Sequence, residues 1–174
     1  PDMDKVEELI KDENVKGIIC VPKYSNPQGI SYSEEVVKRF ANLSPAAPDF
    51  RIFWDNAYVV HHLDFDGKTD EIPSLLNLAK ENGINCAVET SLVYFDERIF
   101  TKLDLVMADL KIWDDVLHKE YTGVSNEVII ENFRKLDELG IPIIARTPVI
   151  PEIEQGIDKI SQFLKGLKNV KQYE

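Results

Sequence analysis

The stretch LVMADL, residues 105–110, is a short apolar run that ends at an acid, and runs of this kind recur along the chain. The others are GIICVP (17–22), FRIFW (50–54), NCAVET (85–90), IPIIART (141–147) and, more weakly, NVKQY (169–173). Short runs that are apolar on both faces are typical of strands buried in a parallel sheet. They predict five strands and a weaker sixth.

Amphipathic segments separate these runs. Their apolar residues recur at helical spacing: Val6, Leu9 and Ile10; Val36, Val37 and Phe40; Ile129, Phe133 and Leu136; Ile160, Phe163, Leu164 and Leu167. Ser31 and Glu34 fit a capping box, while the segments 73–83 and 125–140 each end at a glycine. We therefore predict an α/β fold with a mainly parallel sheet of five or six strands alternating with helices. Binding residues in such sheets lie just past the C-terminal ends of strands.

The composition is that of a globular protein and excludes some partners. The 174 residues are 44% hydrophobic and 29% charged. A net charge of −11 repels phosphate backbones and anionic lipid, so we expect no nucleic-acid and no membrane partner. No apolar run approaches the ~20 residues of a membrane span. Cys20 and Cys86 lie in apolar stretches and are interpreted as reduced core residues of a cytoplasmic protein. Because the chain begins at Pro1, we expect it to be processed, excised or a fragment.

Two strand ends in the first half carry polar residues. Asn26 lies in the turn YSNPQG (24–29), and Asp55 and Tyr58 follow the run FRIFW. A buried asparagine there can donate to an anionic oxygen, and a buried carboxylate needs a cationic partner such as a protonated pyridine nitrogen. Tyr58 could reach a phenolate oxygen on the same ring. By themselves these residues are equally a turn, a strand-end acid and an exposed tyrosine.

The segments VKGIICVPKYSNPQGISYSEE and FRIFWDNAY resemble the large domain of class I, fold-type I aminotransferases, over roughly residues 1–65. The resemblance implies that Asn26 and Tyr58 contact the ring hydroxyl oxygen of pyridoxal phosphate and that Asp55 salt-bridges its pyridine nitrogen. The family also needs a Schiff-base lysine after the next strand. No lysine occurs between Lys80 and Lys102, where ETSLVYF stands instead. Transamination is therefore not expected.

From about residue 75 the resemblance changes. LAKENGINCAVETS, DLVMADLKIWDDVLHKEYTGVSNEVIIENFRKLDELG and IPIIARTPVIP resemble the radical S-adenosylmethionine enzymes that activate glycyl-radical enzymes. By this resemblance a monovalent-cation site would be formed by Glu89, Thr90, Met107 and Asp109. Lys111 and Arg146 would lie near S-adenosylmethionine or the substrate peptide. The alternative is that Asp109 and Lys111 simply pair across a strand end.

This second family's chemical centre is also missing. Its [4Fe–4S] cluster is held by a Cys-x3-Cys-x2-Cys loop, whereas the two cysteines here are far apart, at positions 20 and 86. The glycine-rich motif for the cofactor's amino group is absent, and Glu152 stands where the family usually has glycine. We expect no Fe–S cluster and no radical generation. No cofactor is firmly expected, and pyridoxal phosphate and S-adenosylmethionine are implied by resemblance only.

These observations predict a catalytically incomplete chimera or fragment with vestigial sites, joined between residues 64 and 76. Its expected parts are an aminotransferase-like βαβ fragment (1–70) and a half-barrel fragment (71–174), packed as one sheet. The alternatives are an activating enzyme, an aminotransferase, or a non-catalytic pyridoxal-phosphate-binding module. A metal role for His61 and His62 with Asp64 or Asp66 is a further alternative. We interpret His118 as an exposed loop residue, and expect self-association through exposed sheet edges.

Overall fold

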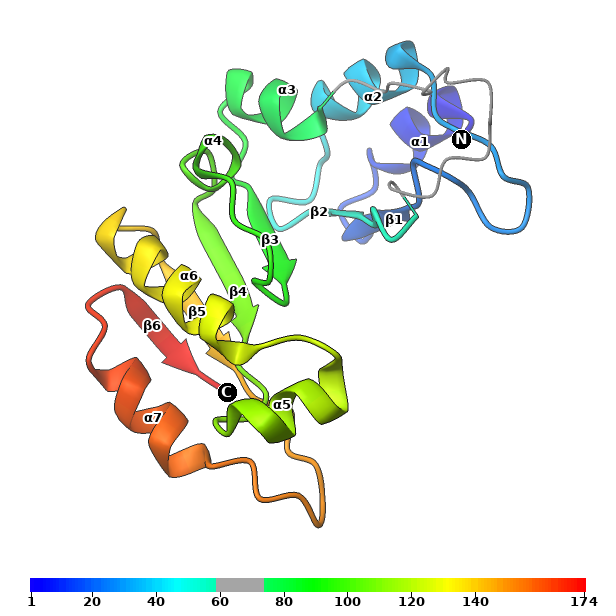
Figure 1. Ribbon diagram of the computed structural model, residues 1–174. Coiled ribbons are helices and arrows are strands. Elements are labelled where there is room, and N and C mark those ends of the chain that lie inside the picture. The colour runs from blue at the N-terminus through cyan, green and yellow to red at the C-terminus, as the bar shows by residue number, and fades with distance from the viewer. Residues whose placement is uncertain (59–73) are drawn as a thin grey trace. The chain divides into compact units, whose positions relative to one another are not determined.

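The computed structural model describes residues 1–58 and 74–174 of the chain (Figure 1). These residues form two compact units, Pro1–Gly83 and Ile84–Glu174. The first unit contains α1 (Met3–Leu9), β1 (Gly17–Cys20), α2 (Glu34–Ala41), β2 (Arg51–Trp54) and α3 (Leu75–Glu81). The second contains β3 (Ala87–Thr90), α4 (Glu97–Phe100), β4 (Leu105–Asp109), α5 (Asp115–Thr122), α6 (Asn126–Glu138), β5 (Ile143–Arg146), α7 (Ile157–Lys165) and β6 (Val170–Tyr173).

The first unit is built on a two-stranded parallel sheet, in which Cys20 at the end of β1 pairs with Trp54 at the end of β2. Its core is aromatic: the ring of Phe40 lies 6.0 Å from that of Tyr32 and 5.5 Å from that of Trp54, measured between centroids. Burial in this core raises the pKa of the Cys20 thiol to about 11, against a lowering by its hydrogen bond with Tyr32. The interpretation of Cys20 as a core residue agrees with this position, whereas Cys86 is only partly buried.

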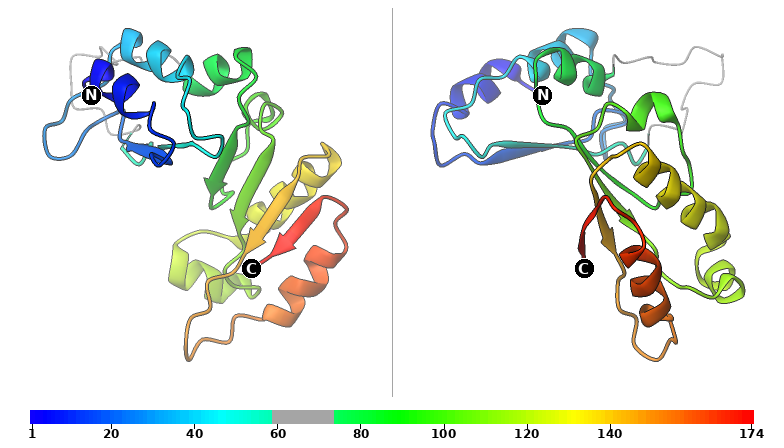
Figure 2. Two further views of the ribbon diagram at one scale, coloured as in Figure 1. Left: turned by 180° about the vertical axis from the view of Figure 1, so that it is seen from behind. Right: turned by 90° about the vertical axis from the view of Figure 1, so that its left-hand side faces the viewer.

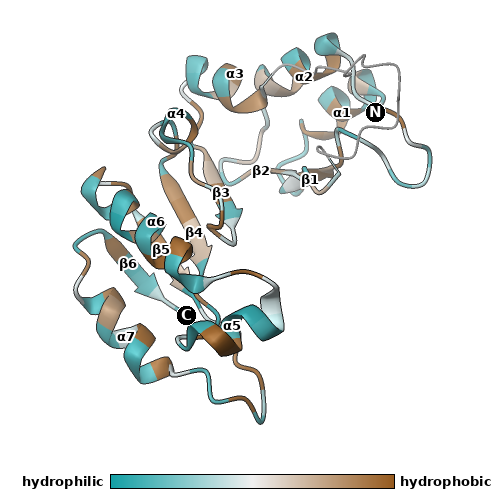
Figure 3. Ribbon diagram, viewed as in Figure 1, coloured by the Kyte–Doolittle hydropathy of each residue, from teal (hydrophilic) through white to brown (hydrophobic). Residues whose placement is uncertain are grey.

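The second unit is built on a four-stranded sheet in the order β3–β4–β5–β6, with every pair parallel. Alternate residues of β4 and β5, such as Val106 and Ile143, are fully buried against Phe133 of α6 and Ile160 of α7. The right-hand view in Figure 2 shows α6 and α7 on the same side of this sheet. In Figure 3, β4 is largely hydrophobic, and hydrophobic and hydrophilic residues alternate along α6. The helices thus cover one face, and the residues between the buried positions lie on the other.

The structure confirms the α/β class and all six expected strands. The described strands pair into one sheet of two strands and one of four, and the packing of the two parts as one sheet stays a prediction. The expected capping box is wrong, because the Ser33 hydroxyl, rather than that of Ser31, accepts from the Val36 N–H at the start of α2. Ser125 and Gly140 bound α6 as expected. Among the described residues, no helix is long and apolar enough to span a membrane.

Candidate functional site

The carboxyl ends of three neighbouring strands bring charged side chains together. Asp109 is the last residue of β4 and is in register with Arg146, the last residue of β5. Glu89 of β3 is in register with Met107, two residues before Asp109. Registered residues in a parallel pair share a face of the sheet, and successive residues alternate between faces. Glu89, Asp109 and Arg146 therefore lie on the face that the helices leave uncovered.

Four of the predicted site residues form one chain of ion pairs, which we call the strand-end cluster: Glu89, Asp109, Lys111 and Arg146. Arg146 Nη2 lies 2.7 Å from Glu89 Oε1 and 3.0 Å from Asp109 Oδ1. Arg146 Nε donates to the same Asp109 oxygen at 3.2 Å. The second oxygen of Asp109 lies 2.7 Å from Lys111 Nζ. Two acids and two bases thus neutralise one another, and the contact between Asp109 and Lys111 agrees with the alternative in which these two residues pair.

The cluster is partly shielded from water. The Arg146 side chain is 24% exposed and that of Asp109 is 21% exposed, while Glu89 is 66% exposed. The hydrogen bond with Glu89, followed by the one with Asp109, raises the pKa of Arg146 although partial burial opposes this. Arg146 therefore stays charged at every accessible pH and fixes the two carboxylates around it.

Thr90 and Met107, the other residues assigned to the cation site, differ from Glu89 and Asp109 in position. The Thr90 side chain alternates with that of Glu89 and so belongs to the helix-covered face, and its hydroxyl accepts from the Leu92 N–H at 3.0 Å. Met107 is partly buried on the open face. The structure thus joins two of the four assigned residues through Arg146, and directs the Thr90 hydroxyl into the loop after β3.

The loop after β3 is held by Asn132 of α6, a residue that the sequence analysis did not single out. Leu92 is fully buried, and its backbone has φ 57°, a conformation that residues other than glycine rarely adopt. Its carbonyl accepts from Asn132 Nδ2 at 3.0 Å, and Asn132 on α6 is itself buried. Asn132 is a polar residue among the apolar residues that α6 buries, and this position was the sequence signal for its role.

The loops after β4 and β5 are tied together in a similar way. Gln155 Nε2 donates to the carbonyls of Lys111, at 2.7 Å, and Pro148, at 2.9 Å. Its Oε1 accepts from the Ile150 N–H at 2.7 Å. Gln155 is 3% exposed, so these bonds are shielded from water. Gln155 therefore positions the backbone from which the Lys111 side chain reaches Asp109.

His118 is not an exposed loop residue, and that prediction was wrong. It lies in α5 and is 1% exposed. Its Nδ1 lies 2.8 Å from the Val124 carbonyl, and because a carbonyl oxygen only accepts, this nitrogen is the donor. His118 thus fastens α5 to the turn that follows it. The segment TGVSN (122–126) therefore has a structural role at the end of α5.

The three residues predicted to hold a pyridine ring occupy a different environment from the one expected. Asp55 directly follows β2, where its N–H donates to the Cys20 carbonyl at 2.8 Å. Its Oδ1 accepts from the Ala57 N–H at 2.9 Å, so the carboxylate closes its own turn. Asn26, Asp55 and Tyr58 are exposed, whereas the prediction required Asn26 and Asp55 to be buried. An exposed carboxylate attracts a pyridinium only weakly, and these residues therefore fit pyridoxal phosphate poorly.

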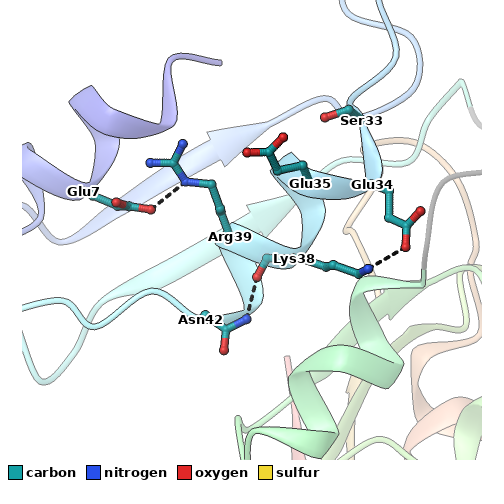
Figure 4. Close-up of a pocket in the computed structure, with 7 residues that line it drawn as sticks. All are labelled: Glu7, Ser33, Glu34, Glu35, Lys38, Arg39 and Asn42. Carbon is teal, nitrogen blue, oxygen red and sulfur yellow. Dashed lines mark hydrogen bonds and ion pairs between the residues drawn. The ribbon is translucent and has the colours of Figure 1, made fainter.

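The first unit also has a shallow pocket that contains none of the predicted site residues. It is lined by residues of α1 and α2 and their flanks: Glu7, Ser33, Glu34, Glu35, Lys38, Arg39 and Asn42 (Figure 4). Arg39 Nε lies 2.8 Å from Glu7 Oε1, and Lys38 Nζ lies 2.6 Å from Glu34 Oε1. The Arg39–Glu7 pair joins α2 to α1, whereas the Lys38–Glu34 pair lies within α2.

The proposed histidine metal site, at His61, His62, Asp64 and Asp66, lies outside the described residues. Within residues 1–58 and 74–174, no group of three or more histidine, cysteine or acidic side chains could hold a metal ion. The predicted cation site is not tested by this, because only two of its four members are acidic.

Comparison with known proteins assigns the N-terminal part. Residues 1–93, more than half of the chain, match the protein family described as aspartate amino-transferase, and the chain belongs to that family over this part. The aspartate aminotransferase of Corynebacterium glutamicum is 51% identical over 78 residues, which make up 45% of this chain and 17% of that protein. The chain thus spans about a sixth of the length of this relative.

The rest of the chain is similar to other proteins. The pyruvate formate-lyase-activating enzyme of Streptococcus mutans is 31% identical over 117 residues, which cover 60% of this chain and 44% of that enzyme. A crystal structure of SuiB from Streptococcus suis, bound to the precursor peptide SuiA, covers 97% of this chain and 42% of SuiB with a TM-score of 0.59. At 14% identity this likeness shows the fold alone. The N-terminal part therefore matches the aspartate aminotransferase family, and the rest is similar to activating enzymes such as that of pyruvate formate-lyase, as the two resemblances predicted.

Proposed function

We propose that the chain is a catalytically incomplete α/β protein whose two sites are remnants of those of its parent families. The strand-end cluster carries this proposal. Arg146 and Lys111 neutralise Glu89 and Asp109 within the protein, at 2.7–3.0 Å. Ion pairs this close leave little uncompensated charge to attract a charged ligand. A self-neutralised cluster of this kind suits a folded scaffold better than an enzyme that awaits a charged cofactor.

The sequence supports the same proposal. After β3, where an aminotransferase would carry its Schiff-base lysine, the chain reads SLVYF. The two cysteines, at positions 20 and 86, cannot form the three-cysteine loop of an activating enzyme. The chain therefore lacks the reacting group of both parents, and we expect neither transamination nor radical formation from it. Its two reduced cysteines suit a cytoplasmic location.

Titration with pyridoxal phosphate, followed by borohydride reduction and peptide mapping, tests whether the aminotransferase-like site is only a remnant. We expect slow, scattered labelling of many surface lysines and no saturable visible band. Lys23 needs particular attention in the map, because it is 4% exposed and lies three residues before Asn26. A saturable band that maps to one lysine, and that Asp55→Asn weakens, would contradict the proposal.

Non-catalytic binding of S-adenosylmethionine is the second candidate function. The observation that favours it is the assembly of Lys111, Arg146 and Asp109 at neighbouring strand ends, since acids and bases there complement the ammonium and carboxylate of an amino acid. Lys111 would hold the carboxylate and Glu89 the ammonium. Calorimetric titration with S-adenosylmethionine decides between the candidates: saturable heat that Lys111→Met abolishes favours binding, and its absence favours the scaffold.

A further inference from the structure

The strand-end cluster already contains a cation between its two carboxylates. Arg146 Nη2 contacts Glu89 Oε1 at 2.7 Å and Asp109 Oδ1 at 3.0 Å. One nitrogen of the guanidinium therefore bridges carboxylates from two different strands. A metal ion held by the same two oxygens would need the position that this nitrogen occupies.

The remaining groups of the predicted cation site do not make room for a metal ion. The other oxygen of Asp109 is engaged by Lys111 Nζ at 2.7 Å, and the Thr90 hydroxyl is engaged by the Leu92 N–H. Two positive side chains at this distance repel any further cation. The contacts of these residues therefore leave no place for the monovalent cation that the family resemblance implies.

We propose that Arg146 is a built-in counter-ion that replaces the metal ion at the ends of β3 and β4. Its guanidinium neutralises Glu89 and Asp109 and joins the two strands without any ion from solution. The stability of the protein therefore does not depend on binding of sodium or potassium at these strand ends. This inference concerns the charge balance of the protein and holds whether or not the chain binds a cofactor.

Thermal unfolding in matched salts tests the proposal. Wild-type protein is unfolded in sodium, potassium and tetramethylammonium chloride at equal ionic strength, and we expect one midpoint temperature in all three. Tetramethylammonium is the reference because it is too bulky to enter between two carboxylate oxygens. Arg146→Met removes the counter-ion and leaves Glu89 and Asp109 without the cation that they share. We expect a lower midpoint in tetramethylammonium and a partial recovery in sodium or potassium.

Arg39→Met is the matched control. Arg39 also bridges two acids, contacting Glu7 through Nε and Asp4 through Nη2, but it does so on the exposed surface of the other unit. The Asp4 side chain is 89% exposed. Removing Arg39 therefore leaves well-hydrated acids, and we expect no recovery that distinguishes sodium or potassium from tetramethylammonium.

Two results would overturn the proposal. One is a wild-type midpoint that rises selectively in sodium or potassium; the other is a folded Arg146→Met that responds equally to all three salts. Broadening of the sodium-23 resonance provides a second readout, expected for the variant and not for the wild type. Because the wild-type measurement needs no substitution, it remains decisive even if Arg146→Met fails to fold.

Discussion

Asp115 joins the start of α5 to the start of α6. Its Oδ1 accepts from Ser125 Oγ at 2.6 Å and from the Asn126 N–H at 3.0 Å, while its Oδ2 pairs with Lys119. The hydrogen bond from Lys119, followed by the one from Ser125, lowers the pKa of Asp115 to about 2. The charged form of this one carboxylate therefore holds two helices and the TGVSN turn in place.

This pKa predicts how stability depends on pH. A depressed folded-state pKa contributes stability above the unfolded-state pKa, near 4, and that contribution is lost as the pH falls toward about 2. We expect Asp115→Asn to lower the free energy of unfolding at pH 7 and to flatten its pH dependence between pH 4 and pH 2. Urea unfolding at several pH values measures both effects. Glu120→Gln, at an exposed position of the same helix, is the control and should follow the wild type.

Asn126 supplies a second test at the residue scale. Its Nδ2 donates to the carbonyls of Ile112, at 3.0 Å, and Trp113, at 2.6 Å, within a buried turn. Asn126→Ala leaves these buried acceptors without a donor and should cost about 1–3 kcal/mol of unfolding free energy. Chemical denaturation measures the change. Gln172→Ala, at an exposed position of β6, should cost far less; equal losses in the two variants would contradict the assigned role.

At the scale of elements, α7 begins under a close steric constraint. Gly156, its N-cap, has φ 67°, and a Cβ added there would lie 2.9 Å from Trp113 Cβ. Gly140, after α6, has φ 73° with open space around the same position. Both glycines permit a left-handed conformation, but only Gly156 also permits a close approach of α7 to the loop after β4.

Replacing each of the two glycines by alanine gives a matched pair of variants. Gly140→Ala should cost about 1 kcal/mol, because an L-residue is strained in the left-handed region. Gly156→Ala should cost about 1–3 kcal/mol more, since the added methyl group also displaces Trp113. Thermal or urea unfolding of both variants measures the difference. A Gly156→Ala protein as stable as Gly140→Ala would show that the contact is easily relieved.

Local chemistry explains which elements the sequence could predict. The six strands are short apolar runs, and α6 begins at Ser125 and ends before Gly140, which are local signals. Helix α5 was missed because its sequence, DVLHKEYT, has few apolar residues and buries His118 instead. Asp114 before it and Gly123 after it were the available cap signals. Helix α4 has four residues, too few to show a period.

The site was predictable only in part, because several of its contacts depend on strand register and loop paths rather than on local sequence. The strand ends of a parallel sheet lie together, but the assignment of Asp109, Lys111 and Arg146 to a site was implied by the resemblance to the activating enzymes. The bridge from Arg146 to Glu89 was not predicted, because it joins residues 57 positions apart and depends on strand register. Gln155 was missed because two of its partners are backbone carbonyls of loops, whose paths the sequence does not specify.

At the scale of the whole molecule, the described residues of the first unit, 1–58 and 74–83, leave one face of its sheet uncovered. Ile19 and Phe53 are paired across β1 and β2 and are 78% and 62% exposed. Parallel sheets are normally covered on both faces, and exposed apolar pairs at short open sheets favour association. This agrees with the reasoning behind the predicted self-association, which remains a prediction.

Light scattering and sedimentation test that prediction. We expect dimers or larger species at working concentration, and we expect Phe53→Lys, alone or with Ile19→Lys, to weaken association by about tenfold or more. Val149→Lys, at a residue of the second unit that is equally exposed, is the control. A monodisperse wild-type monomer would refute self-association, and equal effects of the substitutions would place the contact elsewhere.

The central claim is that both sites are remnants, and scanning calorimetry of the wild-type protein tests it most directly. Unfolding is recorded alone, with pyridoxal phosphate and with S-adenosylmethionine, at millimolar concentrations. A ligand present at 100 times its dissociation constant stabilises the folded state by about 2.7 kcal/mol, which is readily measured. The account predicts unfolding transitions that neither ligand shifts. A saturable rise of the unfolding temperature with either ligand would contradict it and would identify the site that still binds.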